Sequence, residues 1–156
     1  MFEYEIYFHR INTVKESTEI YYKYSNNINC SDQASEILRK IIQEYGQNDR
    51  EHFIVLLLDA QLKINGFNIV SVGSVNAAMV DIRSVLKPII LSNASAIIIG
   101  HNHPSGSLKP SNEDDQVTIR ISDLCKLISV QLCDHIIVTE EQYYSYKENG
   151  KLNSKS

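Results

Sequence analysis

The sequence is poor in the residues that mark unusual classes of protein. Its 156 residues include no tryptophan, three prolines and six glycines. This composition excludes a collagen-like chain and a Pro/Gly-rich disordered chain. The longest apolar runs, 53–58 and 96–99, have the length of strands and fall far short of the roughly 18 residues of a transmembrane helix. The first 20 residues alternate and carry acids, which is not typical of a secretory leader.

Cysteine is also scarce. The three cysteines, Cys30, Cys125 and Cys133, are odd in number and form no CxxC pair. This pattern argues against a disulfide scaffold and against a cysteine-rich zinc site. It favours the reducing cytoplasm as the location, with the cysteines acting as small buried hydrophobic residues.

An excess of charge of one sign is missing as well. The chain has 15 basic and 19 acidic residues and a net charge of -4, which residues 1–50 and 51–156 share equally. A protein that binds nucleic acid through its phosphates normally presents a basic face. The charge therefore gives no support to tight, non-specific DNA binding.

Hydrophobic periodicity predicts strands and helices that alternate imperfectly along the chain. A nearly continuous apolar strand over 53–59, typical of a central strand, forms a hairpin with a strand over 63–72. The other predicted elements are two strands within 1–24, a helix over 32–45, a helix over 82–90 that Pro88 kinks or shortens, a strand over 96–100, a loop over 101–110, a helix from 111 to about 128, and short strands over 135–139 and 143–146. Together they predict an α/β (α+β) domain with one mixed β-sheet flanked by helices.

One segment, over residues 100–115, carries side chains that could bind a metal ion. His101 and His103 follow the apolar strand, and residues two apart in extended backbone point to the same side. Pro104 and Gly106 then turn the chain toward the first turn of the next helix, which bears Asp114. Two histidines and one carboxylate, with the fourth position left to water, form the ligand set of a catalytic zinc site.

Other interpretations of these residues need no metal. Ser111-x-x-Asp114 is also a helix capping box, with Asp in place of Glu. Pairs of the form His-x-His occur by chance at strand ends. Asp115 competes with Asp114 as a ligand, but the spacing favours Asp114, and Asp115 then suits the dipole of the helix.

These residues resemble a known family. The string His101-x-His103-Pro104-x(6)-Ser111-x-x-Asp114 is similar to the JAMM metal motif of the JAB/MPN+ metallohydrolases. The fuller string, His101-Asn102-His103-Pro104-Ser105-Gly106 followed by Pro110-Ser111, resembles the bacterial RadC branch of that family. Residues 51–53, 73–76, 93–94 and 134–137 resemble it too. The resemblance covers about residues 48–150 and implies an MPN/JAB-like fold there. Residues 1–47 would form an N-terminal leader of two strands and a helix packed on this domain, and 151–156 a disordered tail.

The resemblance also implies roles for individual residues. His101, His103 and Asp114 would ligate Zn²⁺. Glu51 would be the general base that takes a proton from the attacking water and returns it to the leaving amine. Ser111 would stabilise the oxyanion of the tetrahedral intermediate.

The remaining histidines have simpler interpretations. His135 follows Asp134 at the start of a predicted strand, and such a pair can orient a metal ligand from the second layer of residues. A histidine at the mouth of a strand is more often structural, so both interpretations stay open. His9 and His52 are predicted to lie at the surface or at strand ends.

The sequence departs from the family pattern at residues 80–85. RadC-like chains commonly have a His-Pro-Arg-Glu-type string here, whereas this chain has Val-Asp-Ile-Arg-Ser-Val and keeps only Arg83 of it. The departure is expected to alter the substrate groove without touching the five core positions.

Two functions follow from these observations. The first is a zinc-dependent metallohydrolase in the cytoplasm that cleaves peptide or isopeptide bonds. The second is a non-enzymatic, DNA-repair-associated interaction module in which zinc is structural. The presence of all five catalytic-type residues favours the enzyme, because a structural zinc needs neither a base nor a free coordination position.

Overall fold

The computed structural model describes residues 27–46, 49–73 and 80–152, and the two strands predicted within 1–24 lie outside these ranges. In chain order the elements are α1 (Ser31–Tyr45), β1 (His52–Leu58), β2 (Ile64–Val72), α2 (Ile82–Ser92), β3 (Ala96–Asn102), α3 (Asn112–Leu127), β4 (Gln131–Val138) and β5 (Tyr143–Ser145). In this part of the chain, no helix combines the length and the apolar character needed to cross a membrane.

The strands form one sheet in the order β2-β1-β3-β4-β5. β3 and β4 are parallel and are joined through α3, while the other neighbouring strands are antiparallel. β1 lies between β2 and β3 and is buried along its whole length. Its predicted central position and its hairpin with β2 are both confirmed.

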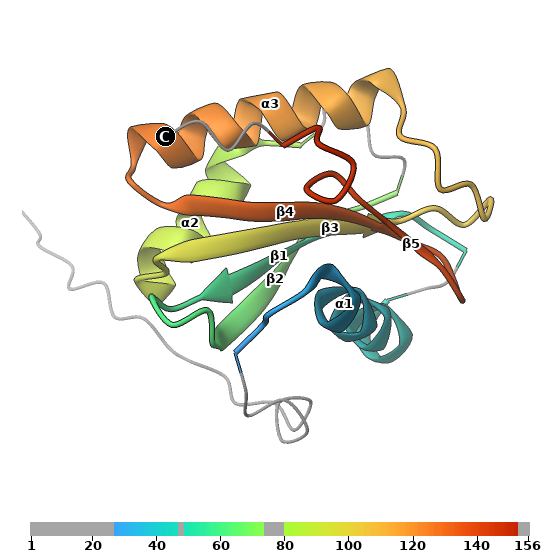
Figure 1. The fold of residues 1–156 in the computed structure, drawn as a ribbon, viewed down its shortest axis with the longest axis horizontal. Helices are drawn as coiled ribbons and strands as arrows, with labels where there is room; N and C mark the ends of the chain where they lie inside the picture. Colours follow the sequence, from blue (N-terminus) through green and yellow to red (C-terminus); the bar gives the residue numbers. More distant parts are fainter. Residues whose placement is uncertain (1–26, 47–48, 74–79, 153–156) are drawn as a thin grey trace, which may run out of the picture.

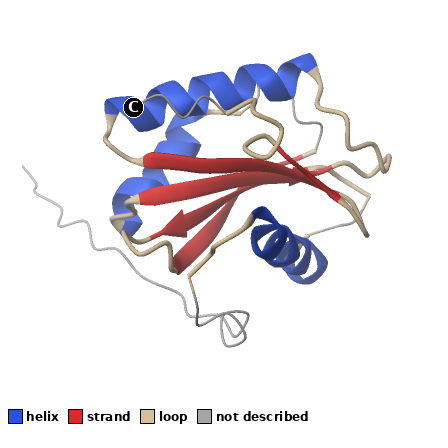
Figure 2. Ribbon diagram, viewed as in Figure 1, coloured by secondary structure: helices blue, strands red, loops and turns tan. Residues whose placement is uncertain are grey.

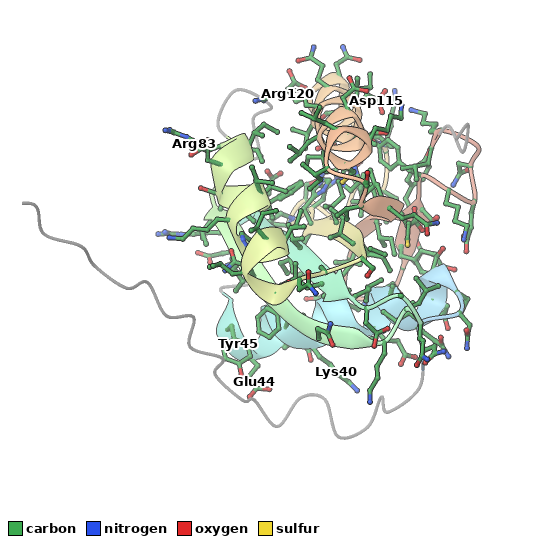
Figure 3. All side chains as sticks on the ribbon, turned by 90° about the vertical axis from the view of Figure 1, so that its left-hand side faces the viewer. Lys40, Glu44, Tyr45, Arg83, Asp115 and Arg120 are labelled. Carbon is green, nitrogen blue, oxygen red and sulfur yellow. The ribbon has the colours of Figure 1, made fainter. Side chains whose placement is uncertain are left out.

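Helices cover both faces of the sheet. α1 lies on one face, and α2 and α3 lie on the other (Figure 1). Each face has its own apolar core, one between α1 and the sheet and one between the sheet and the other two helices. Figure 2 shows the helices on the two sides of the sheet. The side chains of Lys40 and Glu44 on α1 therefore lie across the sheet from Asp115 and Arg120 on α3 (Figure 3). The predicted α+β architecture with a mixed sheet is confirmed.

α1 approaches the sheet closely at Gly100 of β3. Leu38 of α1 is fully buried, and a Cβ atom at position 100 would overlap its Cδ1 atom. The same added atom would also lie 3.1 Å from the carbonyl oxygen of Ile136. Glycine at this position allows α1 to pack against β3.

A buried carboxylate fixes the start of α1. Asp134 of β4 accepts hydrogen bonds through Oδ2 from the hydroxyls of Ser31, at 2.8 Å, and Ser145, at 2.6 Å. Its Oδ1 atom accepts from the backbone N–H groups of His135 and Lys147. Four donors satisfy this carboxylate, which ties α1 to β4 and β5.

The structure corrects four expectations. Cys30 is exposed, although the cysteines are expected to be small buried hydrophobic residues. β4 begins at Gln131 rather than at 135, because Gln131 and Leu132 pair with Ala96 and Ile97, although Gln131 is exposed and Leu132 only partly buried. β3 continues to Asn102, so that His101 is part of the strand and does not follow it. Of the two places expected for His52, the strand end is confirmed, because His52 starts β1, and the surface is wrong, because the residue is buried. Its Nδ1–H donates to the carbonyl of Arg50 at 2.9 Å.

Candidate metal centre

Two histidines and an aspartate converge beside the last residues of β3. The Nε2 atoms of His101 and His103 lie 3.0 Å apart. Asp114 places Oδ1 3.1 Å from Nε2 of His101 and Oδ2 3.6 Å from Nε2 of His103. These three side chains offer ligand atoms that all lie within 4.8 Å of one another, so the cluster could hold a metal ion.

Local backbone structure explains this convergence. His101 lies in β3, and the near-extended chain directs His103 to the same side of the sheet. A turn closed by the Gly106 N–H on the carbonyl of His103 follows, and Gly106 takes a positive φ of 77° that glycine adopts without strain. The loop then reaches α3, whose first turn carries Asp114.

The capping box and the cluster share Asp114. The Ser111 hydroxyl accepts from the Asp114 N–H at 3.1 Å, and Asp114 Oδ2 accepts from the Ser111 N–H at 2.8 Å. The metal-free interpretation of this motif therefore describes a real feature of the helix. The capping box does not exclude metal binding, because the Asp114 carboxylate that caps the helix still faces the imidazoles of His101 and His103.

The electrostatics of the cluster favour a cation. The His103 Nδ1–H donates to the carbonyl of Ser107 at 2.7 Å, so its Nε2 atom faces the cluster. A hydrogen bond with Asp114 raises the pKa of His103 despite partial burial. Burial alone would raise the pKa of Asp114, but hydrogen bonds with His101 and His103 outweigh it and hold that pKa well below its usual range. An ionised carboxylate beside two imidazole nitrogens is a donor set that fits Zn²⁺.

Glu51 lies at the edge of this cluster. Phe53 of β1 pairs directly with His101 of β3, and their rings are 6.1 Å apart. Glu51 directly precedes β1, and if the alternation of the strand continues to it, its side chain lies on the same face as Phe53, beside His103. The negative charge of Glu51 contributes to the raised pKa of His103. Glu51 is not one of the three clustered residues, and its role as a base stays a prediction.

Comparison with known proteins agrees with this geometry. The family model described as the RadC-like JAB domain matches residues 28–151, a range that includes every helix and strand of the structure. The chain belongs to the RadC-like JAB domain family. The resemblance seen in the sequence and the MPN/JAB-like fold are both confirmed.

The relatives of this RadC-like domain include several curated bacterial proteins. A UPF0758 protein of Desulfitobacterium hafniense is 40% identical over 117 residues, which cover 75% of this chain and 52% of the relative. A UPF0758 protein of Rubrobacter xylanophilus is 41% identical over 104 residues, covering 67% and 45%. One of Streptococcus gordonii is 36% identical over 119 residues, covering 76% and 53%. The chain thus spans about half the length of these relatives, whose names state no activity.

Asn102 lies between His101 and His103 in this RadC-like domain, and the sequence analysis missed its contacts. Its side-chain oxygen accepts from the backbone N–H of His52 at 2.7 Å, and its side-chain NH₂ donates to the carbonyl of Arg50 at 2.8 Å. These two backbone groups flank Glu51, so the amide fixes the backbone on both sides of it. The one sequence signal that could have pointed to Asn102 is its position, as a polar residue between two histidines at the end of an apolar strand.

His135 lies directly behind His101 and is completely buried. Its Nε2 atom is 2.9 Å from Nδ1 of His101, and its Nδ1 atom is 2.6 Å from Oγ1 of Thr118. Burial lowers the pKa of His135 well below its ordinary value, so the ring is neutral near pH 7. The Asp134 carboxylate accepts from the backbone N–H of His135 and from the hydroxyl of Ser31 on α1, so it is directed to the face of the sheet that α1 covers.

The departure from the family pattern at residues 80–85 coincides with the start of α2. Asp81 caps this helix by accepting from the Arg83 N–H at 3.1 Å. The Arg83 side chain is 91% exposed, and its Nε atom lies 3.3 Å from Oδ1 of Asp81. Figure 3 shows this side chain pointing away from the body of the domain. The expected effect on a substrate groove stays a prediction.

Proposed function

We propose that this RadC-like domain is a zinc-dependent hydrolase of peptide or isopeptide bonds. The observation that carries the proposal is the convergence of His101, His103 and Asp114. Among the described residues the cluster has three members, and three protein ligands with one open position are typical of catalytic zinc. The three unpaired cysteines are compatible with action in the cytoplasm.

Each residue has a task in this proposal. His101, His103 and Asp114 would hold Zn²⁺, which when bound lowers the pKa of water to about 7 and so supplies hydroxide at neutral pH. Glu51 would accept a proton from the attacking water and return it to the leaving amine. Ser111 would donate its hydroxyl hydrogen to the oxyanion, while its oxygen keeps the hydrogen bond that caps α3.

A structural zinc in a DNA-repair-associated module is the competing function. Structural zinc sites are normally closed by four protein ligands, whereas three residues cluster in the described part of the chain. The net charge of -4 does not favour contact with phosphates. These points support the hydrolase over the module, and measurements of metal content and turnover separate the two.

The test compares metal content and turnover in matched variants. Purified protein would be assayed for zinc by elemental analysis and then screened against peptides and isopeptide-linked substrates. Glu51→Gln should retain zinc and lose turnover, since an amide cannot accept the proton. Glu113→Gln makes the same change at an exposed residue of the first turn of α3 and should leave both quantities unchanged. Zinc without turnover in the wild type would favour the module, and wild-type turnover in Glu51→Gln would remove Glu51 as the base.

A further inference from the structure

A buried row of hydrogen-bonded polar groups begins at His101 and ends at Asp114, which are both members of the candidate metal site. It runs from Nδ1 of His101 to Nε2 of His135 over 2.9 Å, and from Nδ1 of His135 to Oγ1 of Thr118 over 2.6 Å. From Oγ1 of Thr118 it continues to the carbonyl oxygen of Asp114 over 2.6 Å. Both histidines are completely buried and Thr118 is 5% exposed. The row therefore connects two of the three candidate ligands without passing through the cluster.

If His101 binds a metal, the direction of every hydrogen bond in this row is determined. This inference rests on the zinc site proposed above. A neutral imidazole that ligates through Nε2 carries its hydrogen on Nδ1, which donates to Nε2 of His135. The single hydrogen of neutral His135 then lies on Nδ1 and donates to Oγ1 of Thr118. The Thr118 hydroxyl in turn donates to the carbonyl of Asp114, which can only accept.

We propose that His135 and Thr118 are positioning residues that hold His101 in the Nδ1–H tautomer and so present its Nε2 atom to the metal. Thr118 lies one helical turn after Asp114, so the last hydrogen bond of the row is made within α3. The ring of Tyr146 is stacked on His135, with centroids 4.6 Å apart and planes 14° apart. This stacking restricts the ring of His135 to the plane in which both nitrogens reach their partners.

Removing the Thr118 hydroxyl should therefore weaken zinc binding. Thr118→Val keeps the size of the side chain but leaves the buried Nδ1–H of His135 without its acceptor. The other tautomer of His135 would place an N–H against the N–H of His101. Either arrangement penalises the metal-bound state, and we expect zinc affinity to fall about 10- to 100-fold. Thr118→Ser keeps the hydroxyl and should restore affinity to within about 3-fold of the wild type.

The test measures zinc affinity and histidine tautomers in the same proteins. Affinity would be obtained by competition with a chromophoric chelator for the wild type, Thr118→Val and Thr118→Ser. Thr139→Val removes a hydroxyl just beyond β4 and serves as the matched control, with unchanged affinity expected. In zinc-loaded wild type, long-range ¹H–¹⁵N spectra of ¹⁵N-histidine protein should show the hydrogen of His135 on Nδ1.

Each outcome decides a different point. Wild-type protein that binds zinc with the hydrogen of His135 on Nε2 would overturn the inference and leave the proposed function standing, even if Thr118→Val failed to fold. Equal zinc affinity of Thr118→Val and the wild type would overturn it too. A wild type that binds no zinc would overturn the proposed function and this inference with it.

Discussion

Asp114 and Asp115 are consecutive residues of α3, but their carboxylates have different partners. Asp114 is buried and faces the imidazoles of His101 and His103. Asp115 accepts from the hydroxyl of Tyr146 at 2.8 Å and pairs with Lys151 at 3.3 Å. Of the two aspartates that the sequence offers as ligands, the structure brings only Asp114 to the cluster.

This difference predicts opposite results for one substitution at neighbouring positions. Asp114→Asn should abolish stoichiometric zinc binding, because it replaces the ionised ligand of the cluster with a neutral amide. Asp115→Asn should keep zinc at the wild-type level and lose at most about 1 kcal/mol of stability with its exposed ion pair. Elemental analysis after dialysis against metal-free buffer measures both. Equal zinc contents in the two variants would contradict the assignment.

Asn102 should affect turnover more than zinc content. Asn102→Ala releases the backbone on both sides of Glu51, and small misplacements of a catalytic group can cost about 10²-fold in rate. We expect kcat to fall by about that factor while zinc stays bound. Asn68→Ala, at an exposed residue of β2, is the control and should leave kcat unchanged. A wild-type kcat in Asn102→Ala would show that Glu51 does not depend on this amide.

Ser111→Ala separates the cap from the proposed oxyanion donor. Loss of the capping hydrogen bond should lower the free energy of unfolding by about 1 kcal/mol. Loss of the donor should lower kcat by about 10²-fold with zinc retained. Melting temperature and kcat, measured on one preparation, report the two effects. A drop in melting temperature without a drop in kcat would leave Ser111 as a cap alone.

Gly100→Ala should destabilise the fold. The added Cβ atom would overlap Leu38 of α1 and crowd the carbonyl of Ile136, and overpacking of this kind costs about 1–3 kcal/mol. Gly66→Ala is the matched control within the same sheet, because its Cβ atom would meet Leu57 at an ordinary 3.8 Å. Denaturant unfolding of both variants measures the difference. Equal stabilities would mean that α1 does not pack tightly on β3 at this position.

The three cysteines should react with alkylating reagents at different rates. Burial raises the pKa of Cys125 to about 11, and it raises the pKa of Cys133 as well. Because the thiolate is the reactive form, both should react slowly at pH 8, and Cys125 faster as the pH approaches 11. Exposed Cys30 should account for the fast phase, which Cys30→Ser should remove. Mass spectrometry of timed samples identifies the modified residue, and early labelling of Cys125 would contradict the prediction.

The sequence predicts the apolar elements best. The buried run of β1 and the helical spacing in α1 are signals of burial, and both elements lie within one residue of their predicted bounds. The predicted start of β4 is too late because Gln131, Leu132 and Cys133 show no clear alternation. Their strand structure depends on pairing with β3, which local periodicity does not record.

At the site, too, the sequence predicts the residues of a local motif but not the residues that act through tertiary contacts. The residues brought together at the cluster stand in one continuous motif, so their spacing is informative. Thr118 and Asn102 act through hydrogen bonds to residues or backbone groups far from them in the chain or on another strand. Threonines inside helices and asparagines at strand ends are common in proteins without any role at a site. The register of β1 against β3 reveals the contacts of Asn102, and the packing of α3 on β4 reveals that of Thr118.

Alternation along β3 also bears on how this sequence can change over generations. His101 and Asn102 are adjacent, so one contributes to the cluster and the other, on the opposite side of the strand, secures the backbone around Glu51. Inserting or deleting a single residue between 96 and 100 would exchange the two sides. Replacement of one branched aliphatic residue by another at 97–99 would leave both side chains in place. A change in the number of residues in β3 would therefore disturb the site more than a change in the identity of its apolar side chains.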